Sequence, residues 1–207
     1  TNATADVVIG DNTGTASNRG WSAGAINVNA AANLTVKNTA LIVKGDAENT
    51  LSSSNITITG ASLSADNNLT IMGTNVTFSG SNTLMDKVGV TAETVTLDHA
   101  ALSGPVNLTA PVVSFTNSSQ VAGKLTVNAA ETGGAVQLTG GVNVTGNDIQ
   151  LNAAEAKIGD GSDATTITAN NVSTNGKLTF NQTDVNVANN ITTTAANGEI
   201  ALKGAVN

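Results

Sequence analysis

Residues 68–78, NLTIMGTNVTF, contain the pattern that decides the fold: an apolar, a small polar and a second apolar residue, occurring twice. Alternation with a period of two places both apolar side chains of a unit on one face of a strand and the middle side chain on the other. Thr, Val and Ile are favoured in strands, whereas Gly and Asn between the units favour turns. The segment therefore predicts two short strands joined by a turn.

Similar units recur along most of the chain at regular intervals. The first strand of each pair is expected to begin at residue 69, 88, 106, 125 or 142, and double steps extend this series back to Leu34 and forward to Leu178. A second strand is expected seven residues after the first. A third apolar position precedes the next pair, at Leu84, Leu102, Val121 and Ile158. Such a fixed period is typical of a solenoid.

The period, with no helical pattern, predicts an all-β fold: a right-handed parallel β-helix with about 18–19 residues and three short strands per rung. Rungs stacked at the strand spacing of about 4.8 Å would form a rod of roughly nine rungs, about 40–45 Å long. Aliphatic side chains would fill a narrow core without aromatic residues, which make up 2% of the chain. The alternative is an up-and-down β-sandwich, whose strands are normally about five or six residues long.

We expect residues 1–207 to form a single β-helix with one less regular end. Residues 1–25 fit the period worst and are expected to form an irregular N-terminal rung or cap. Three interruptions of the spacing predict loops that protrude from the rod, near residues 44–55, 128–135 and 159–166.

Composition excludes several classes of function. The chain has 28 Asn and 31 Thr among its 207 residues, which disfavours the helices of an ordinary α/β enzyme. Eight Lys and Arg against 15 Asp and Glu give a net charge of −7, so we expect no nucleic-acid partner, because no basic patch is present to neutralise phosphates. No apolar run approaches the length of a membrane span. The absence of Cys excludes disulfides and thiolate metal sites.

Segments of the form Asn-apolar-Thr-apolar, at residues 33–36, 68–71 and 75–78, resemble the β-helical passenger segments of bacterial surface adhesins. The resemblance is to two-partner-secretion exoproteins of the filamentous-haemagglutinin and high-molecular-weight types, and to autotransporter passengers. It implies a secreted or outer-membrane-associated segment of a longer protein, with no cofactor. The implied partners are a host-cell surface glycan or protein, or other bacteria through self-association.

Residues capable of catalysis or metal binding are sparse. His99 is the only histidine and follows Asp98; we interpret it as a solvated residue at a strand end. The acidic residues are spread singly along the chain, so we expect no catalytic group and no enzyme activity, the alternative being a β-helical polysaccharide-acting enzyme. The loop Gly159–Asp163 has the oxygen donors and glycines of one calcium-binding turn, but it occurs once. We interpret it as a plain turn and expect no metal site.

Two further patterns lie on the strands. Asn-Xaa-Ser/Thr sequons make Asn68, Asn75, Asn107 and Asn143 candidate glycosylation sites, although the strand motif itself creates such sequons. Pairs such as Thr57 with Thr59, Thr77 with Ser79 and Thr94 with Thr96 would point outward, as in ice-binding solenoids. We expect these rows not to persist, because other units break them: Thr70 is followed by Met72, Asn107 by Thr109 and Asn143 by Thr145.

Overall fold

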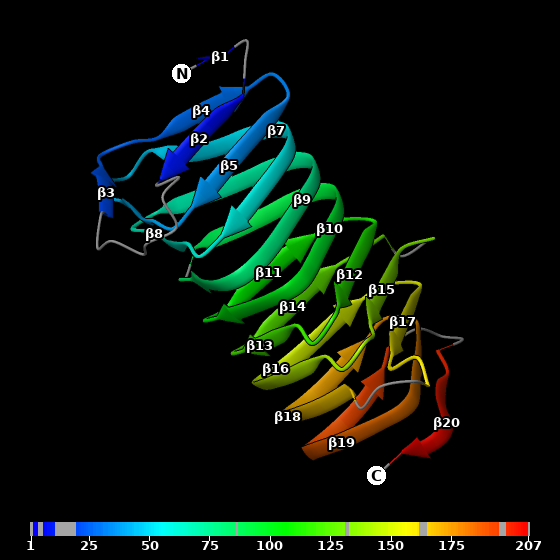
Figure 1. The fold of residues 1–207 in the computed structure, drawn as a ribbon. Helices are drawn as coiled ribbons and strands as arrows, with labels where there is room; N and C mark the ends of the chain where they lie inside the picture. The colour runs from blue at the N-terminus through cyan, green and yellow to red at the C-terminus, as the bar shows by residue number, and fades with distance from the viewer. Residues whose placement is uncertain are drawn as a thin grey trace.

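A computed structural model describes residues 2–3, 6–10, 20–85, 87–130, 133–161, 165–194 and 198–206. The chain winds into a β-solenoid of about nine turns, in which parallel strands pair with strands of the neighbouring turns. The ends of the chain lie at opposite ends of a rod (Figure 1). In the ranges given above, no helix is long and apolar enough to cross a membrane. The predicted parallel β-helix is confirmed, and the sandwich alternative is wrong.

The solenoid has three faces, called here A, B and C in the order in which the chain crosses them. Face A contains β1 (Asn2–Ala3), β4 (Asn27–Ala30), β11 (Val106–Thr109), β14 (Leu125–Asn128) and parts of β7 (Glu48–Thr59), β9 (Asn68–Leu84), β10 (Val88–Ser103), β16 (Asn143–Asn152), β18 (Thr165–Thr174) and β19 (Lys177–Thr193). Face B contains β2 (Val7–Gly10), β5 (Asn33–Lys37), β12 (Val112–Thr116), β15 (Ala135–Leu138), β17 (Glu155–Ile158), β20 (Ile200–Val206) and parts of β7, β9, β10 and β19. Face C contains β3 (Gly20–Ala23), β6 (Ala40–Val43), β8 (Ser62–Ala65), β13 (Gln120–Ala122) and parts of β9, β10, β16, β18 and β19.

The interior file expected from the 18–19-residue spacing is present on face A. Leu69 pairs with Val88, and Val106 pairs with Leu125. The register of β10 on β11 joins the two pairs, since it sets Val90 against Leu108. The side chains of Leu69, Val88, Val106 and Leu125 are all buried. The file continues with Ile149, which pairs with Leu125.

The spacing is less regular than expected outside these central turns. Leu125 and Ile149 are 24 residues apart, and Val7 pairs with Leu34, 27 residues later. The extra residues lie at the corners, where an insertion leaves the interior stacks intact. A period of 18–19 residues is therefore correct for the middle of the rod and too short for most of the rest.

These insertions make four of the expected strand positions wrong. Leu34 pairs with Ile56 on face B, and Leu178 pairs with Ala156 on the same face, so neither continues the file of Leu69. The unit that starts at Val142 lies on face C, where Val144 pairs with Val121. Ile158 lies on face B, not at the third position. The same three-residue unit builds all three faces, so an insertion shifts a unit to another face without changing its appearance.

The expected loops agree with the structure only in part. Residues 48–55 belong to β7, so the interruption expected at 44–55 is reduced to residues 44–47. The backbone of β7 remains extended around the A–B corner, and β9 crosses all three faces in 17 residues, far longer than the short strands expected. Residues 129–134 and 159–164 lie between strands, but 131–132 and 162–164 are outside the described residues.

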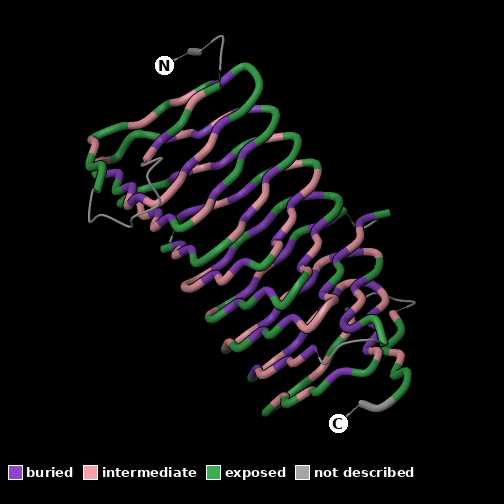
Figure 2. The backbone as a smooth tube through the Cα atoms, in the orientation of Figure 1, coloured by how far each residue is buried: buried purple, intermediate pink, exposed green. Residues whose placement is uncertain are grey.

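The core is not purely aliphatic, contrary to the sequence-based expectation. All three phenylalanines of the chain are fully buried, and they occupy one file of face B: Ile58, Phe78, Leu97, Phe115, Leu138, Ile158 and Phe180. Figure 2 shows buried positions alternating with intermediate or exposed ones along the strands of the central turns. The interior of face B is therefore wide enough for aromatic rings, which occupy three of the seven positions in this file.

Glycines permit close packing of successive turns at the C–A corner. Gly123 has a φ of 139°, and a Cβ atom there would collide with the carbonyl oxygen of Gly104 in the preceding turn. A Cβ atom on Gly146 would collide in the same way with the carbonyl oxygen of Gly123. The corner therefore has no side chains at these positions, and its surface is hollow.

Candidate functional site

His99 lies at the B–C corner, in the turn after the face-B segment of β10. Its Nδ1 lies 3.0 Å from Asp98 Oδ1, and Asn117 Nδ2 in the next turn donates a hydrogen bond of 2.6 Å to the same oxygen. The bond from Asn117, and secondarily the adjacent His99, hold the pKa of the Asp98 carboxyl below its ordinary value. His99 has a φ of 48°, and Asn38 and Asn117 have similar values at this corner. The turn thus accounts for the position of His99.

The structure does not bring the other acidic residues of the described ranges into one site. Asp98 pairs in register with Thr116, Asp148 with Asn171 and Asp184 with Thr166. The described residues include no group of three His, Asp or Glu side chains that could hold a metal ion. In the predicted turn 159–163, Gly159 has a φ of 81°, whereas Ser162 and Asp163 lie outside the described residues.

Asparagine side chains form a hydrogen-bonded ladder at the start of face B. Asn75 Nδ2 donates to Asn55 Oδ1 at 3.0 Å, Asn55 Nδ2 donates to Asn33 Oδ1 at 3.3 Å, and Asn33 Nδ2 donates to Asp6 Oδ1 at 2.9 Å. These exposed side chains are the first residues of three sequons. The ladder gives the sequon asparagines a structural role, because stacked amides satisfy one another along the rod.

The four candidate glycosylation sites differ in their surroundings. Asn75 is exposed but its amide nitrogen donates within the ladder. Asn68, Asn107 and Asn143 are exposed on or beside strands. Asn68 Nδ2 donates to Thr70 Oγ1 at 3.4 Å, and Asn143 Oδ1 accepts from Thr145 Oγ1 at 3.2 Å. A modification at Asn75 would disrupt the ladder, whereas the other three positions carry no such role.

Outward hydroxyl groups form a column on face B. Strand register places these in one line over five turns: Thr35, Thr57, Thr77, Thr96 and Ser114. The units expected to break the rows lie on other faces: Thr70 and Asn107 are on face A, and Asn143 is on face C. The parallel column contains Thr59 and Ser79; it ends at Lys37 on one side, and on the other the register of β9 on β10 shifts after Leu97. The hydroxyl array therefore has one long row and one short row.

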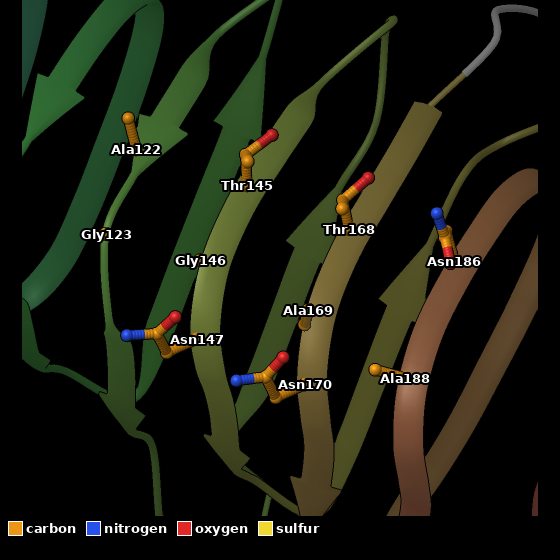
Figure 3. Close-up of a pocket in the computed structure, with 10 residues that line it drawn as sticks. All are labelled: Ala122, Gly123, Thr145, Gly146, Asn147, Thr168, Ala169, Asn170, Asn186 and Ala188. Atoms are coloured by element: carbon orange, nitrogen blue, oxygen red, sulfur yellow. The ribbon is translucent and has the colours of Figure 1, made fainter.

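A groove of about 540 Å³ runs along the C–A corner, and we call it the C–A groove. Two central turns line it with similar tripeptides, residues 145–147 (Thr-Gly-Asn) and 168–170 (Thr-Ala-Asn), which are in register. Ala122 and Gly123 line it in the preceding turn, and Asn186 and Ala188 in the following one. In Figure 3 the two threonines are parallel to each other, and so are the two asparagines.

The lining of the C–A groove defines what it can bind. Hydroxyl and amide groups both donate and accept hydrogen bonds, and glycine and alanine form the floor between their rows. None of the lining residues is charged. Asn147, Asn170 and Thr145 are exposed and so remain accessible to a ligand. The site is thus suited to an uncharged ligand with many hydroxyl groups.

Sequence reasoning did not identify this groove. Asn147 and Asn170 are two of 28 asparagines, and they are 23 residues apart. Only the register of β16 on β18 brings them together. The available signal was the repeated Thr-small-Asn tripeptide, which becomes informative once the length of that turn is known.

Comparisons with known proteins leave the fold and the residues above as the basis for assigning a function. No protein-family model, curated protein or solved structure matches this chain.

Proposed function

We propose that this chain is an adhesive, rod-forming segment of a bacterial surface or secreted adhesin. It attaches the cell to a glycan or protein on a host cell, or to other bacteria, and holds the contact at a distance through its stiffness. The resemblance of the Asn-apolar-Thr-apolar segments to adhesin passengers supports this proposal, and so does the solenoid fold.

One observation carries the proposal: an uncharged outward column that runs the length of face A. Strand register aligns its nine members as Asn27, Thr50, Thr70, Gly89, Asn107, Thr126, Gln150, Ser173 and Thr192. Except at Gly89, each member carries a hydroxyl or amide group, at the spacing of strands, about 4.8 Å. Many weak contacts along such a surface add together through multivalency.

Adhesion of coated beads tests the proposal. Beads that carry the folded chain are expected to bind to epithelial cells or to bacteria more strongly than beads that carry heat-unfolded chain. The double variant Asn107→Glu with Thr126→Glu places two charges in the middle of the column and is expected to weaken adhesion. The proposal fails if folded and unfolded chains adhere equally to both kinds of cell.

The hydroxyl column on face B favours a second candidate function, binding to ice. Its five side chains repeat along a flat sheet face at a fixed spacing. Inhibition of ice recrystallisation by the purified chain is the test, with Thr77→Lys as the variant that interrupts the column. Ice crystals that coarsen at the same rate with and without the chain exclude this candidate.

A further inference from the structure

Two neighbouring turns of the C–A groove present the same three kinds of residue at matching positions. Thr145 pairs with Thr168, and Gly146 pairs with Ala169, so the hydroxyl, the small residue and the amide recur one strand spacing apart. Thr145 Oγ1 donates to Asn143 Oδ1, which leaves its lone pairs free to accept. The ladder between β16 and β18 fixes these positions. A ligand whose units advance by the strand spacing can contact the same kinds of group in these two turns.

The spacing distinguishes between two classes of linear ligand. An extended peptide rises about 3.3–3.4 Å per residue, so a peptide along the rod would lose register with turns spaced about 4.8 Å apart. An extended β-1,4-linked sugar chain advances by roughly one such spacing per sugar, so successive sugars lie near successive turns, with adjacent sugars rotated by about half a turn and presenting opposite edges. The four turns of the groove would hold about four sugars, one for each turn.

Charge restricts the ligand further. The lining residues are uncharged, so the groove offers no cation for a sulfate or carboxylate group. The nearby charged residues lie outside the lining. Lys124 follows Gly123 at one edge of the groove. Asp148 lies beside the row of asparagines, and its Oδ1 accepts a hydrogen bond of 2.8 Å from Asn171 Nδ2. Thr145 Oγ1 is already oriented by its hydrogen bond to Asn143 Oδ1, so it loses little entropy when it accepts from a sugar hydroxyl group.

We infer that the C–A groove binds a neutral, linear, β-linked oligosaccharide along the axis of the rod, with one sugar per turn. This inference rests on the proposed adhesive function, and it adds to the face-A column a second binding surface with a defined class of ligand. Asn147 and Asn170 bind successive sugars through their amides, Thr145 and Thr168 accept or donate on the other side, and the apolar face of each sugar packs on the floor of the groove.

Titration calorimetry with defined hexasaccharides tests the inference. Cellohexaose and β-1,4-mannohexaose are the extended probes, and maltohexaose is the matched probe, because its α-linkages coil the same number of sugars. The wild-type chain is expected to bind an extended probe at least about tenfold more tightly than maltohexaose. Raising the salt concentration should leave the affinity unchanged, because the contacts are uncharged.

Variants locate the binding site. The double variant Asn147→Ala with Asn170→Ala is expected to lower the affinity about tenfold, since each amide contributes a modest hydrogen-bond energy. Ala122 is exposed, so the indole ring introduced by Ala122→Trp should block the groove. The matched control is Asn67→Ala with Asn68→Ala, two exposed asparagines outside both the groove and the face-A column, and it should bind as the wild type does. Circular dichroism melts verify that each variant folds.

The outcomes separate this inference from the proposed function. Binding that survives in the groove variants, or beads that adhere although no neutral hexasaccharide binds, overturns the inference and leaves the adhesive function standing. Hexasaccharide binding in the groove without bead adhesion supports the inference and overturns the adhesive function. Absence of both overturns both.

Discussion

Replacing Leu125 by Asp tests the alternation of inward and outward side chains at two adjacent residues. Leu125 is fully buried on face A, between Val106 and Ile149 of the neighbouring turns. Thr126 points outward between Asn107 and Gln150. Leu125→Asp and Thr126→Asp therefore introduce the same carboxylate one residue apart, one inside the rod and one on its surface.

The structure sets the expected size of each effect. Removing a buried leucine side chain costs about 3 kcal/mol, because the strand ladders above and below prevent the turns from closing the cavity. Burial of an unpaired carboxylate adds several kcal/mol more, so we expect Leu125→Asp to cost at least about 5 kcal/mol. That is comparable with the whole stability of a typical domain, about 5–15 kcal/mol. Thr126→Asp should change the free energy of unfolding by less than about 0.5 kcal/mol.

Urea unfolding followed by far-UV circular dichroism measures the two effects. Because each turn contacts only its neighbours, part of the rod can unfold locally. Hydrogen exchange followed by mass spectrometry should therefore be measured in addition to urea unfolding, and it should show loss of protection around β14 in Leu125→Asp. Leu125→Asn is the matched variant, because its side chain is polar but uncharged. It should lower the free energy of unfolding less than Leu125→Asp does. If Thr126→Asp destabilised the chain as much as Leu125→Asp, the assignment of interior and surface would be refuted.

Three further effects follow from the corners and the ladder. Asn55→Ala removes two amide hydrogen bonds of the exposed ladder and should lower the free energy of unfolding in urea by about 0.5–1.5 kcal/mol. Gly123→Ala should cost more than about 1 kcal/mol in thermal melts, because the new Cβ atom would collide with the preceding turn at a positive φ. Asn117→Ala should raise the pKa of Asp98, measured by NMR titration, because it removes the bond that most lowers it. In the wild type the stabilisation linked to this low pKa is present above about pH 4 and is lost as the pH falls through the lowered value.

Each of these effects has a control. Asn107→Ala, outside the ladder, should leave the stability unchanged, and equal losses in both asparagine variants would contradict the structural role of the ladder. Gly89→Ala meets open space and should be neutral or slightly stabilising. His99→Ala should also raise the pKa of Asp98, since it removes a hydrogen bond and a coulombic attraction to the carboxylate. A pKa of Asp98 that does not change in Asn117→Ala would contradict the assignment.

The sequence predicted the kind of fold because its strongest signal, the three-residue unit, directly reflects which side chains point inward. It predicted the file of Leu69 correctly, because no insertion interrupts the turns around it. It failed at Leu34 and Leu178, because corner insertions change the phase while the unit itself is identical on every face. The length of each turn is a tertiary property, and one chain with similar units on three faces does not encode it locally.

The groove and the phenylalanine file were missed for a related reason. Phe78, Phe115 and Phe180 each end a unit of the form apolar-polar-Phe, which is a visible signal that they share one interior position. The low aromatic content points the other way, because it favours a core without aromatic rings. Asn147 and Asn170 had no comparable signal, since asparagine is common throughout the chain.

The pairing of each turn with its immediate neighbours determines how the rod would respond to tension on its ends. Under a pull along the axis, a turn detaches when it loses the strand pairing with one neighbour, while the pairs between the other turns remain in place. A detached turn of about 20 residues extends to about 60–70 Å, whereas it occupied about 4.8 Å while stacked. A tether of this design lengthens step by step under load, and the remaining turns stay folded while it does so.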